Sequence, residues 1–592
     1  MNVPNTIYDY IKTEETNYAL PVQVIDQWEW SMKEHIKLSV LYKNSVYSTG
    51  KDDQKPFKNI TRPILNLQYR AEGFDVKDIE MFVDDARYYY KSLVIRKFHE
   101  KWAREHGLDD FIDEMVESYI DFGGALVKNV NQIKPEVIPL QSIAFCDQTD
   151  ILSGPIAIKH FYSPDQLLDM EEYGWGKPEN NATVTLEELI ILAQNEKIKD
   201  SQDGKTTKTP GKYIEIYEVH GNLPEKFIGE KNSDSEKYCS QMQIVAFYTD
   251  KEGKSQGVTL FSGKEKESIF KLILRDDIYG RALGLGGAEE LFEPQVWVNY
   301  DIIRIKEMLD EAAKIIYKTT DGSFAKRNNT KDLETGEILT LADGTDIGQV
   351  DNFPRNISMF EKSISDWEAH AQQMGSASDA IMGESPKSGT PFKLQELVTN
   401  NSQGLHDYRR GKLSTFLDGI YKDWIIPHLK TEIVNEQKFL AELDVKEMQT
   451  IADAITEKKV NEGVMETILN GDIPNAEDIE LARTESREKF LSGDNKKFFK
   501  IFKDEMKDVA VDVRVNIAGK QEYMRERVDK LVNVFRQVLG NPAALAEPAM
   551  ADLFNKIIES SGLEQIDFSG IKAPEQAPQQ APQEQAPQDV VL

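Results

Sequence analysis

The glycines in YGRALGLGGAEELF are the first residues whose spacing suggests chemistry, because glycine-rich turns that open a helix can bind phosphate groups. A dinucleotide-binding fingerprint that starts at Gly284 needs a glycine at position 289, where the chain has Glu289. The run Gly204-Lys205-Thr206 is similar to the end of a P-loop, but the first glycine of that motif is replaced by Lys199. Neither phosphate-binding motif is therefore complete.

Histidine, cysteine and acidic residues form no recognisable catalytic or metal-binding pattern. The chain has no HExxH, GxSxG or EF-hand run, and Cys146 and Cys239 have no CxxC or Cys/His spacing around them. Among 101 acidic residues, any pair of carboxylates has many equivalents. We therefore expect no catalytic residues, no cofactor, no metal site and no enzymatic activity, and two isolated cysteines suit a reducing compartment.

The composition is that of a large globular protein. Its 592 residues allow roughly three to five domains or one large elaborated fold, and 40% of the residues are hydrophobic and 29% charged. No stretch approaches the roughly 18 to 20 apolar residues of a membrane helix, and the N-terminus has no signal-peptide pattern, so we expect neither membrane insertion nor secretion. The net charge of −30 disfavours a wide basic surface for DNA, although acidity alone also suits simple solubility.

The first half is expected to be mixed α and β. Apolar residues at helical spacing predict one helix over 76–104 and another over 109–121, and Ser163-Pro164 predicts the start of a short helix. The polar run 199–212 predicts a surface loop. Strands are predicted at ALVKNV, EVIPL, SIAFC, KYIEIYEVHG, MQIVAFYTD and SIFKLILRD, of which the last three suggest an antiparallel layer with one wet face.

The second half is expected to be mainly helical. Over 294–318 and again over 360–381, apolar residues alternate between spacings of four and three, which predicts two helices with heptad-like seams. Taken alone, each seam is explained nearly as well by an ordinary intramolecular core. The seam residues are Val298, Ile302, Ile305, Leu309, Phe360, Ile364, Trp367 and Met374.

A polar stretch, 319–356, separates these two helices, and ETGEILTL and DGTDIGQV within it are expected to form a hairpin. A Gly/Pro loop and a long helix over 392–430, bent near Gly404 and Gly411, follow the second seam. DVRVNIAG is expected to be a strand. The Ala/Pro/Gln-rich tail from Ala573 cannot build a core and is expected to be disordered.

This order of elements resembles the portal proteins of tailed bacteriophages and herpesviruses. YGRALGLGGAEELFEPQVWVNYDIIRIKEMLDEA is similar to that family's entry into the first stem helix, and GSASDAIMGESPKSGTPFKLQELVTNNSQG to the second stem helix and tunnel loop. FGGALVKNV and IAIKHFYSPDQLLD are similar to its wing. The resemblance implies an α+β, mainly helical portal fold with wing, stem, clip and crown that assembles into a ring.

The resemblance also implies bounds for each region of the chain. These are the N-terminal region and wing (1–285), first stem helix (286–318), clip (319–356), second stem helix (357–382), tunnel loop (383–391), long bent helix with the rest of the wing (392–520), helical crown (521–570) and disordered tail (571–592).

The resemblance further implies a ring, commonly of twelve subunits, at one capsid vertex. Double-stranded DNA would pass through it, and terminase, tail or adaptor proteins, major capsid protein and scaffolding protein would be its partners, with assembly in the host cytoplasm and no membrane contact. Twelve copies would carry about −360 formal charges, so DNA would slide and not stick. The clip would dock the packaging motor and later the adaptors.

The tunnel loop implied by the resemblance contains a single basic residue, Lys387, which we expect to approach DNA phosphates, although a solvated loop lysine is an equal alternative. The loop consists of Gly383, Glu384, Ser385, Pro386, Lys387, Ser388, Gly389 and Thr390.

Two other interpretations of the sequence are open. One is an acidic helical adaptor or scaffold without a DNA channel, and the other is a nucleic-acid enzyme with dispersed carboxylates. Solution mass separates the adaptor from a ring, and metal-dependent DNA cleavage would reveal the enzyme.

Overall fold

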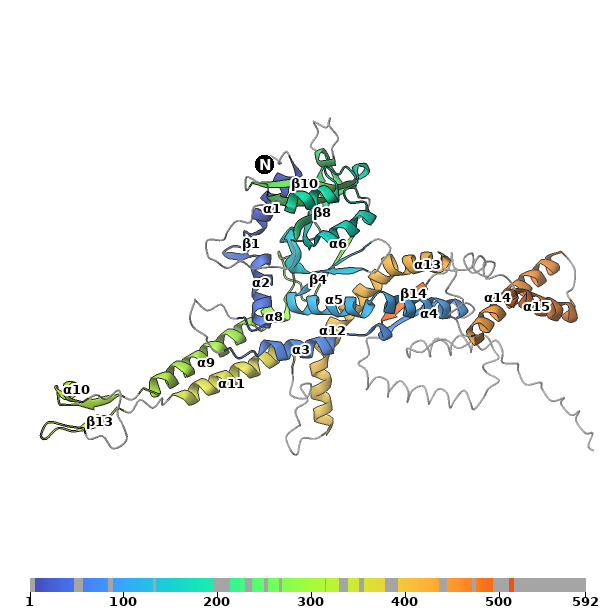
Figure 1. The fold of residues 1–592 in the computed structure, drawn as a ribbon. Coiled ribbons are helices and arrows are strands. Elements are labelled where there is room, and N and C mark those ends of the chain that lie inside the picture. Colours follow the sequence, from blue (N-terminus) through green and yellow to red (C-terminus); the bar gives the residue numbers. More distant parts are fainter. Residues whose placement is uncertain are drawn as a thin grey trace, which may run out of the picture. The chain divides into compact units, whose positions relative to one another are not determined.

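The computed structural model has an α+β fold, as expected, and divides into two compact units (Figure 1). Unit 1 comprises 1–73, 111–130 and 135–413, and unit 2 comprises 74–110, 131–134 and 414–592. The region bounds implied by the portal resemblance stay predictions. The structure describes residues 6–46, 57–83, 89–130, 135–194, 213–228, 237–249, 254–265, 269–314, 316–328, 339–350, 356–377, 392–435, 445–470, 475–492 and 511–515.

Unit 1 is built around a five-stranded antiparallel sheet with the order β10-β9-β8-β7-β6. The register places Tyr217 of the central strand opposite Lys159 on one side and Val245 on the other. The runs KYIEIYEVHG and MQIVAFYTD form two of its strands, as expected. The five strands are β6 (Ile143–Phe145), β7 (Ile156–Tyr162), β8 (Ile214–Pro224), β9 (Tyr238–Thr249) and β10 (Ser255–Lys264).

The expectation of one wet face for this layer is wrong, because both faces of β8 are buried. Ile214 and Ile216 lie in one hydrophobic cluster with residues of α6 (Pro164–Asp169) and α7 (Leu186–Gln194). Tyr217 and Val219 lie in a second cluster with residues of α1 (Ile7–Tyr18) and α2 (Met32–Lys43). Helices on both faces therefore turn this sheet into an interior layer.

SIFKLILRD lies in a different sheet from the one expected. Its strand β11 (Phe270–Leu274) pairs with β4 (Gly124–Lys128), which in turn pairs with β5 (Glu136–Ile138). Unit 1 also contains a hairpin of β1 (Val22–Ile25) and β2 (Trp28–Trp30).

Two helices have boundaries where the sequence predicts them. The helix expected over 109–121 is α5 (Leu108–Phe122), and Gly123 follows it with a φ of +77°. Ser163 caps α6 and forms a capping box with Gln166, while Pro164 occupies the first turn. The helix α3 (Thr61–Glu72) lies in unit 1 as well.

Unit 2 corrects one helix prediction. The segment expected as one helix over 76–104 contains a short turn, the strand β3 (Ile79–Val83) and then α4 (Tyr89–Glu105). The strand pairs in antiparallel register with β14 (Val511–Val515), which lies in DVRVNIAG as expected. The apolar spacing of this segment predicts a helix, but pairing with a strand far along the chain makes its first part a strand.

The core of unit 2 forms where α4 meets the end of the long helix. His99 Nε2 lies 2.9 Å from the Tyr421 hydroxyl, and burial lowers the pKa of His99 to about 4. The Trp102 ring packs against the rings of His106 and His428, with centroids 5.2 and 6.0 Å away. Two further helices in this unit are α14 (Val445–Leu469) and α15 (Ala476–Leu491).

The long helix expected over 392–430 begins as α12 (Phe392–Ile420) and runs without interruption through Gly404 and Gly411. Its irregularity is a π-helical turn, Tyr421–Ile425, before α13 (Ile426–Asn435). The expected disruption therefore lies after the two glycines, where a π turn inserts an extra residue. The loop 199–212, the tunnel loop, the crown and the tail lie outside the described residues.

Candidate functional site: a two-helix arm and the charge cluster at its base

Two helices of unit 1, α9 (Phe292–Ala312) and α11 (Ile357–Met374), lie side by side and run in opposite directions as a projecting arm (Figure 1). The short helix α8 (Gly287–Glu290) leads into the arm. The first helix ends at Ala312 and not at Lys318, because the chain there turns into the strand β12 (Tyr317–Thr319).

The seam residues expected from the sequence are not equally buried. Val298 is fully buried, and four others pack against the same hydrophobic cluster, which includes Ile64 and Ala371. Ile305 and Phe360 are half-buried, and Leu309, farther along α9, is 49% exposed. The four partly buried members of this cluster from the expected seam are Ile302, Ile364, Trp367 and Met374.

A small module joins the outer ends of the two helices. Its strands β12 and β13 (Ile347–Gln349) pair in antiparallel register, and the short helix α10 (Phe324–Arg327) lies between them in the sequence. DGTDIGQV thus contains a strand as expected, and that strand pairs with Tyr317–Thr319. Most of ETGEILTL lies outside the described residues, so the expected hairpin stays a prediction. The Asp321 carboxylate accepts hydrogen bonds from the backbone amides of Ser323 and Ala342, at 3.0 and 3.1 Å, and fixes the turn.

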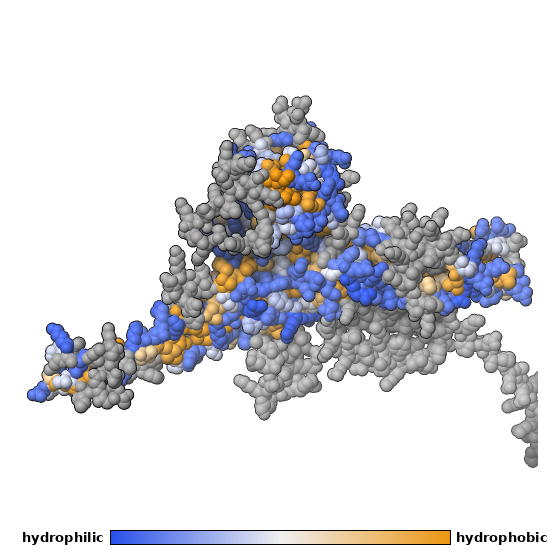
Figure 2. Space-filling view, viewed as in Figure 1, coloured by the Kyte–Doolittle hydropathy of each residue, from blue (hydrophilic) through white to orange (hydrophobic). Residues whose placement is uncertain are grey.

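Four rings form a continuous aromatic row across one side of the arm. Trp297 and Trp367 stack with centroids 6.0 Å apart and planes 6° apart. Tyr300 packs edge-on to Trp297 at 6.0 Å, and His370 packs edge-on to Trp367 at 5.7 Å. Trp297 is 43% exposed and Tyr300 46% exposed, so the row faces outward. Figure 2 shows hydrophobic residues along this arm.

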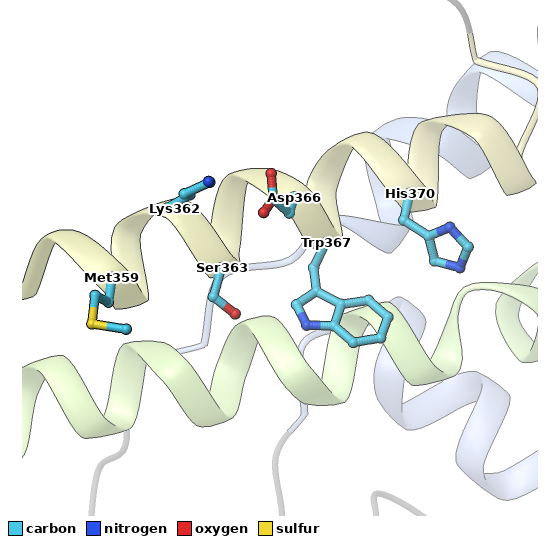
Figure 3. Close-up of a pocket in the computed structure, with 6 residues that line it drawn as sticks. All are labelled: Met359, Lys362, Ser363, Asp366, Trp367 and His370. Carbon is cyan, nitrogen blue, oxygen red and sulfur yellow. The ribbon is translucent and has the colours of Figure 1, made fainter.

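The aromatic row borders a shallow groove of about 610 Å³ on α11. Figure 3 shows Met359, Ser363 and Trp367 along the side of α11 that borders α9, with Lys362 and Asp366 farther out. His370 closes one end of the groove. Met359 itself is 70% exposed.

The base of the arm contains a cluster of buried charges. Glu72 and Arg275 are fully buried and joined at 3.1 Å between Oε1 and Nη2. Arg409 Nη2 lies 2.6 Å from Asp276 Oδ2, and Arg275 and Arg409 each lie 3.8 Å from Glu290 Oε2. Burial raises the pKa of Glu290, although Arg409 and Arg275 oppose that shift. Charges in such an interior persist only because they are paired.

His406 connects this cluster to both roots of the arm. Its Nδ1 lies 3.0 Å from Glu72 Oε1 and its Nε2 lies 3.4 Å from the Ser376 carbonyl, just past the end of α11. Glu290, in the same cluster, directly precedes the entry into α9. One group of side chains thus anchors the start and the end of the arm to α3 and α12.

The glycine run that resembled a nucleotide fingerprint has a packing role. A Cβ on Gly284 would lie 2.5 Å from the Asp276 carbonyl oxygen, and one on Gly286 would lie 2.4 Å from the Asp121 carbonyl oxygen. A Cβ on Gly287 would lie 2.6 Å from Gln68 Oε1. At Gly284 and Gly286 backbone segments approach one another too closely for a side chain, whereas at Gly287 the space is taken by side chains of α3 and Arg275.

A second buried charge group lies in the sheet of unit 1. Glu218 accepts from Lys128, from His160 Nε2 at 3.0 Å and from His220 Nε2 at 2.9 Å. His220 Nδ1 lies 3.3 Å from both carboxylate oxygens of Glu265. Burial alone would lower the pKa of His220, but its hydrogen bonds to Glu218 and Glu265 outweigh burial and raise it.

The same hydrogen bonds act in the opposite direction on Glu218. Burial favours the neutral acid, but bonds from His160 and His220 and the charge of Lys128 hold the pKa of Glu218 well below its usual value. Within the described ranges, no group of three or more His, Cys, Asp or Glu residues could hold a metal ion. No helix in that part of the chain is long and apolar enough to span a membrane.

Sequence reasoning missed the aromatic row and the charge cluster. Trp297 and Tyr300, and likewise Trp367 and His370, stand three residues apart, so each pair shares a helix face, but the sequence does not show that the pairs meet. No local pattern in the sequence indicated the charge cluster, because its members come from four separate segments.

Comparisons with known proteins place the chain in no established family. No protein-family model matches it, and no curated protein matches it. Among solved structures it is similar to a chain from the virion of a native gene transfer agent particle, with a TM-score of 0.26 and 9% sequence identity. That superposition covers 74% of this chain and 100% of the other. A TM-score this low does not establish a shared fold.

Proposed function

We propose that the chain is a portal protein, the subunit of a ring at one capsid vertex through which a phage genome is packaged and ejected. The observation that carries this proposal is the arm of α9 and α11, tipped by a small polar module and inserted between a mixed α/β body and the long helix α12. This is the order of elements in which the sequence resembles portal proteins.

The exposure of the arm supports assembly into a larger object. A hairpin of two helices can bury one stripe of each helix, and the stripes left over carry the half-exposed Trp297 and Tyr300 and the largely exposed Met359. Contiguous exposed apolar surface of this kind is typical of protein interfaces. A closed ring of heterologous contacts covers such stripes in every copy.

The net charge of the chain favours a channel through which DNA slides, and disfavours a protein that binds DNA tightly. A ring of twelve copies would carry about −360 formal charges from −30 per chain, and a wall of that sign repels phosphate. In this proposal Lys387, in the tunnel loop, is the residue that approaches DNA, while terminase supplies ATP hydrolysis.

Negative-stain electron microscopy and mass photometry of the purified full chain test the proposal. Rings of about a dozen subunits with a central hole would support it. A uniform monomer or dimer well above micromolar concentration, also in the presence of scaffolding protein, would overturn it and favour the acidic adaptor without a channel.

Two variants test the finer assignments once rings are seen. Lys387→Ala particles should package or retain less DNA, and wild-type packaging would show that the contact is dispensable. Deleting the tip of the module, within 319–356, should leave rings intact but stop adaptor binding. Unchanged binding would place the docking site elsewhere on the subunit.

A further inference from the structure

The base of the arm contains several buried polar atoms that have no hydrogen-bond partner among the described residues. They belong to side chains of the charge cluster and to the nearby Gln68, and Gln68, Glu72 and Arg275 have no exposed surface. A buried polar atom without a partner loses its hydrogen bonds to water and gains none in return. The atoms are the donors Arg275 Nε and Nη1 and Arg409 Nε and Nη1, and the acceptors Gln68 Oε1, Glu72 Oε2 and Glu290 Oε2.

The longer ion pairs of the cluster do not satisfy these atoms. Glu290 Oε2 lies 3.8 Å from Arg275 Nη1 and 3.8 Å from Arg409 Nη2, and Arg409 Nη1 lies 3.7 Å from Glu72 Oε1. Direct hydrogen bonds between nitrogen and oxygen span roughly 2.7–3.2 Å. Polar atoms of opposite charge therefore stand near one another where the chain enters α9, without a direct hydrogen bond between them.

The mixture of unpaired donors and acceptors defines the kind of ligand that suits this place. A small anion would accept from the guanidinium groups, but it would also approach the carboxylates of Glu72 and Glu290. A metal cation would bind the carboxylates, but it would also approach Arg275 and Arg409. A neutral molecule that both donates and accepts suits both sets of atoms, and water is the smallest one. Buried water typically makes about three hydrogen bonds to otherwise unsatisfied polar groups.

We propose that the base of the arm is a binding site for internal water, in which one molecule bridges Glu290 Oε2 to the guanidinium groups of Arg275 and Arg409. This water completes the attachment of α9, because Glu290 lies at the end of α8, directly before that helix enters the arm. The root of the arm is thus hydrated, in contrast to the apolar seam around Val298. The site lies within one chain, so the inference does not depend on the proposed ring.

A structure of the full-length protein at about 2 Å resolution or better tests the proposal directly. We expect a density peak at hydrogen-bond distance, roughly 2.7–3.2 Å, from Glu290 Oε2 and from a guanidinium nitrogen of Arg275 or Arg409. Absence of this peak, for example because Glu290 bonds directly to a guanidinium group, overturns the proposal. Crystals soaked in bromide separate water from an anion, because an anomalous signal at the peak would assign it to a halide and would also overturn the proposal.

Oxygen-17 relaxation dispersion counts long-lived internal water in solution, and variants locate that water. Glu290→Met removes the acceptor and should lower the count by about one molecule per chain or more. Glu293→Met is the matched control, because Glu293 is exposed in the first turn of α9, and it should leave the count unchanged.

Glu290→Gln keeps an acceptor oxygen and should retain the water, which separates loss of the bridge from loss of the charge. An equal count in Glu290→Met and wild type overturns the bridging role of Glu290. The density test uses the wild-type chain, so it decides the proposal even if Glu290→Met does not fold.

Discussion

His406 Nδ1 lies 3.0 Å from Glu72 Oε1, although one residue belongs to α12 and the other to α3, and both side chains are withdrawn from solvent. The same Glu72 oxygen lies 3.1 Å from Arg275 and 3.7 Å from Arg409. Three potential cations therefore share one carboxylate oxygen. We therefore expect the base of the arm to depend strongly on Glu72.

Replacing Glu72 with Gln should destabilise the chain by about 3–5 kcal/mol, because it leaves buried guanidinium groups without their carboxylate. The measurement is urea unfolding followed by circular dichroism. Glu34→Gln is the control, since Glu34 pairs with Lys37 on an exposed helix surface and should cost less than about 0.5 kcal/mol. Equal shifts for the two variants would contradict the role of the cluster.

The sheet of unit 1 should respond to pH through Glu218 and His220. The folded-state pKa of His220 is raised above 6.5, so its contribution to stability is complete below that pH and is lost as pH rises through the raised pKa. The pKa of Glu218 is lowered from 4.5, so its contribution is present above that pH and is lost as pH falls through the lowered pKa.

The free energy of unfolding, measured as a function of pH, checks both statements. His220→Gln should flatten the alkaline fall in stability, whereas His370→Gln, at an exposed position, should leave the profile unchanged. An alkaline slope that persists in His220→Gln would assign it to other groups.

Replacing glycine with alanine should change the stability of the chain in opposite directions at two positions. Gly123 has a φ of +77°, and an added Cβ would lie 2.3 Å from the Gly284 carbonyl oxygen, so Gly123→Ala should cost about 2–4 kcal/mol. Gly404 lies within α12 with nothing near its missing Cβ, so Gly404→Ala should stabilise the chain by about 0.5–1 kcal/mol. Thermal unfolding measures both, and a loss for Gly404→Ala would refute a regular helix there.

The stacked tryptophans of the arm should be energetically coupled. A double-mutant cycle with Trp297→Ala and Trp367→Ala should give a coupling of about 0.5–1.5 kcal/mol beyond the two separate costs. The cycle is measured by denaturant unfolding at a protein concentration below that of any self-association. Additive costs would show that the two rings do not meet in solution.

Local patterns predicted the elements whose partners are close in sequence or whose ends are marked. Ser163 with Pro164 gave the start of α6, and the alternating spacings around Val298 and Ile364 gave the two arm helices. The helix expected over 76–104 failed because Ile79–Val83 pairs with Val511–Val515, and such distant pairing leaves no trace in a local window.

Of the candidate site, the sequence predicted only which faces of the two arm helices pack together. The spacing of Ile302 and Trp367 indicated which faces pack, but the pairing of the helices brings Trp297 onto Trp367, and three-dimensional packing alone brings Glu72 to His406. The tunnel loop was placed by resemblance and lies outside the described residues, so Lys387 stays a prediction.

Anchoring both roots of the arm on one charge cluster has a mechanical consequence. A load applied to the module between β12 and β13 reaches the body through two parallel rods that end at Glu290 and beside Ser376. Because both ends are linked to the cluster around Glu72, we expect the two helices to respond to such a load together. We therefore expect a displacement of the tip to reach α12 through the contacts of His406 and Arg409 with Glu72.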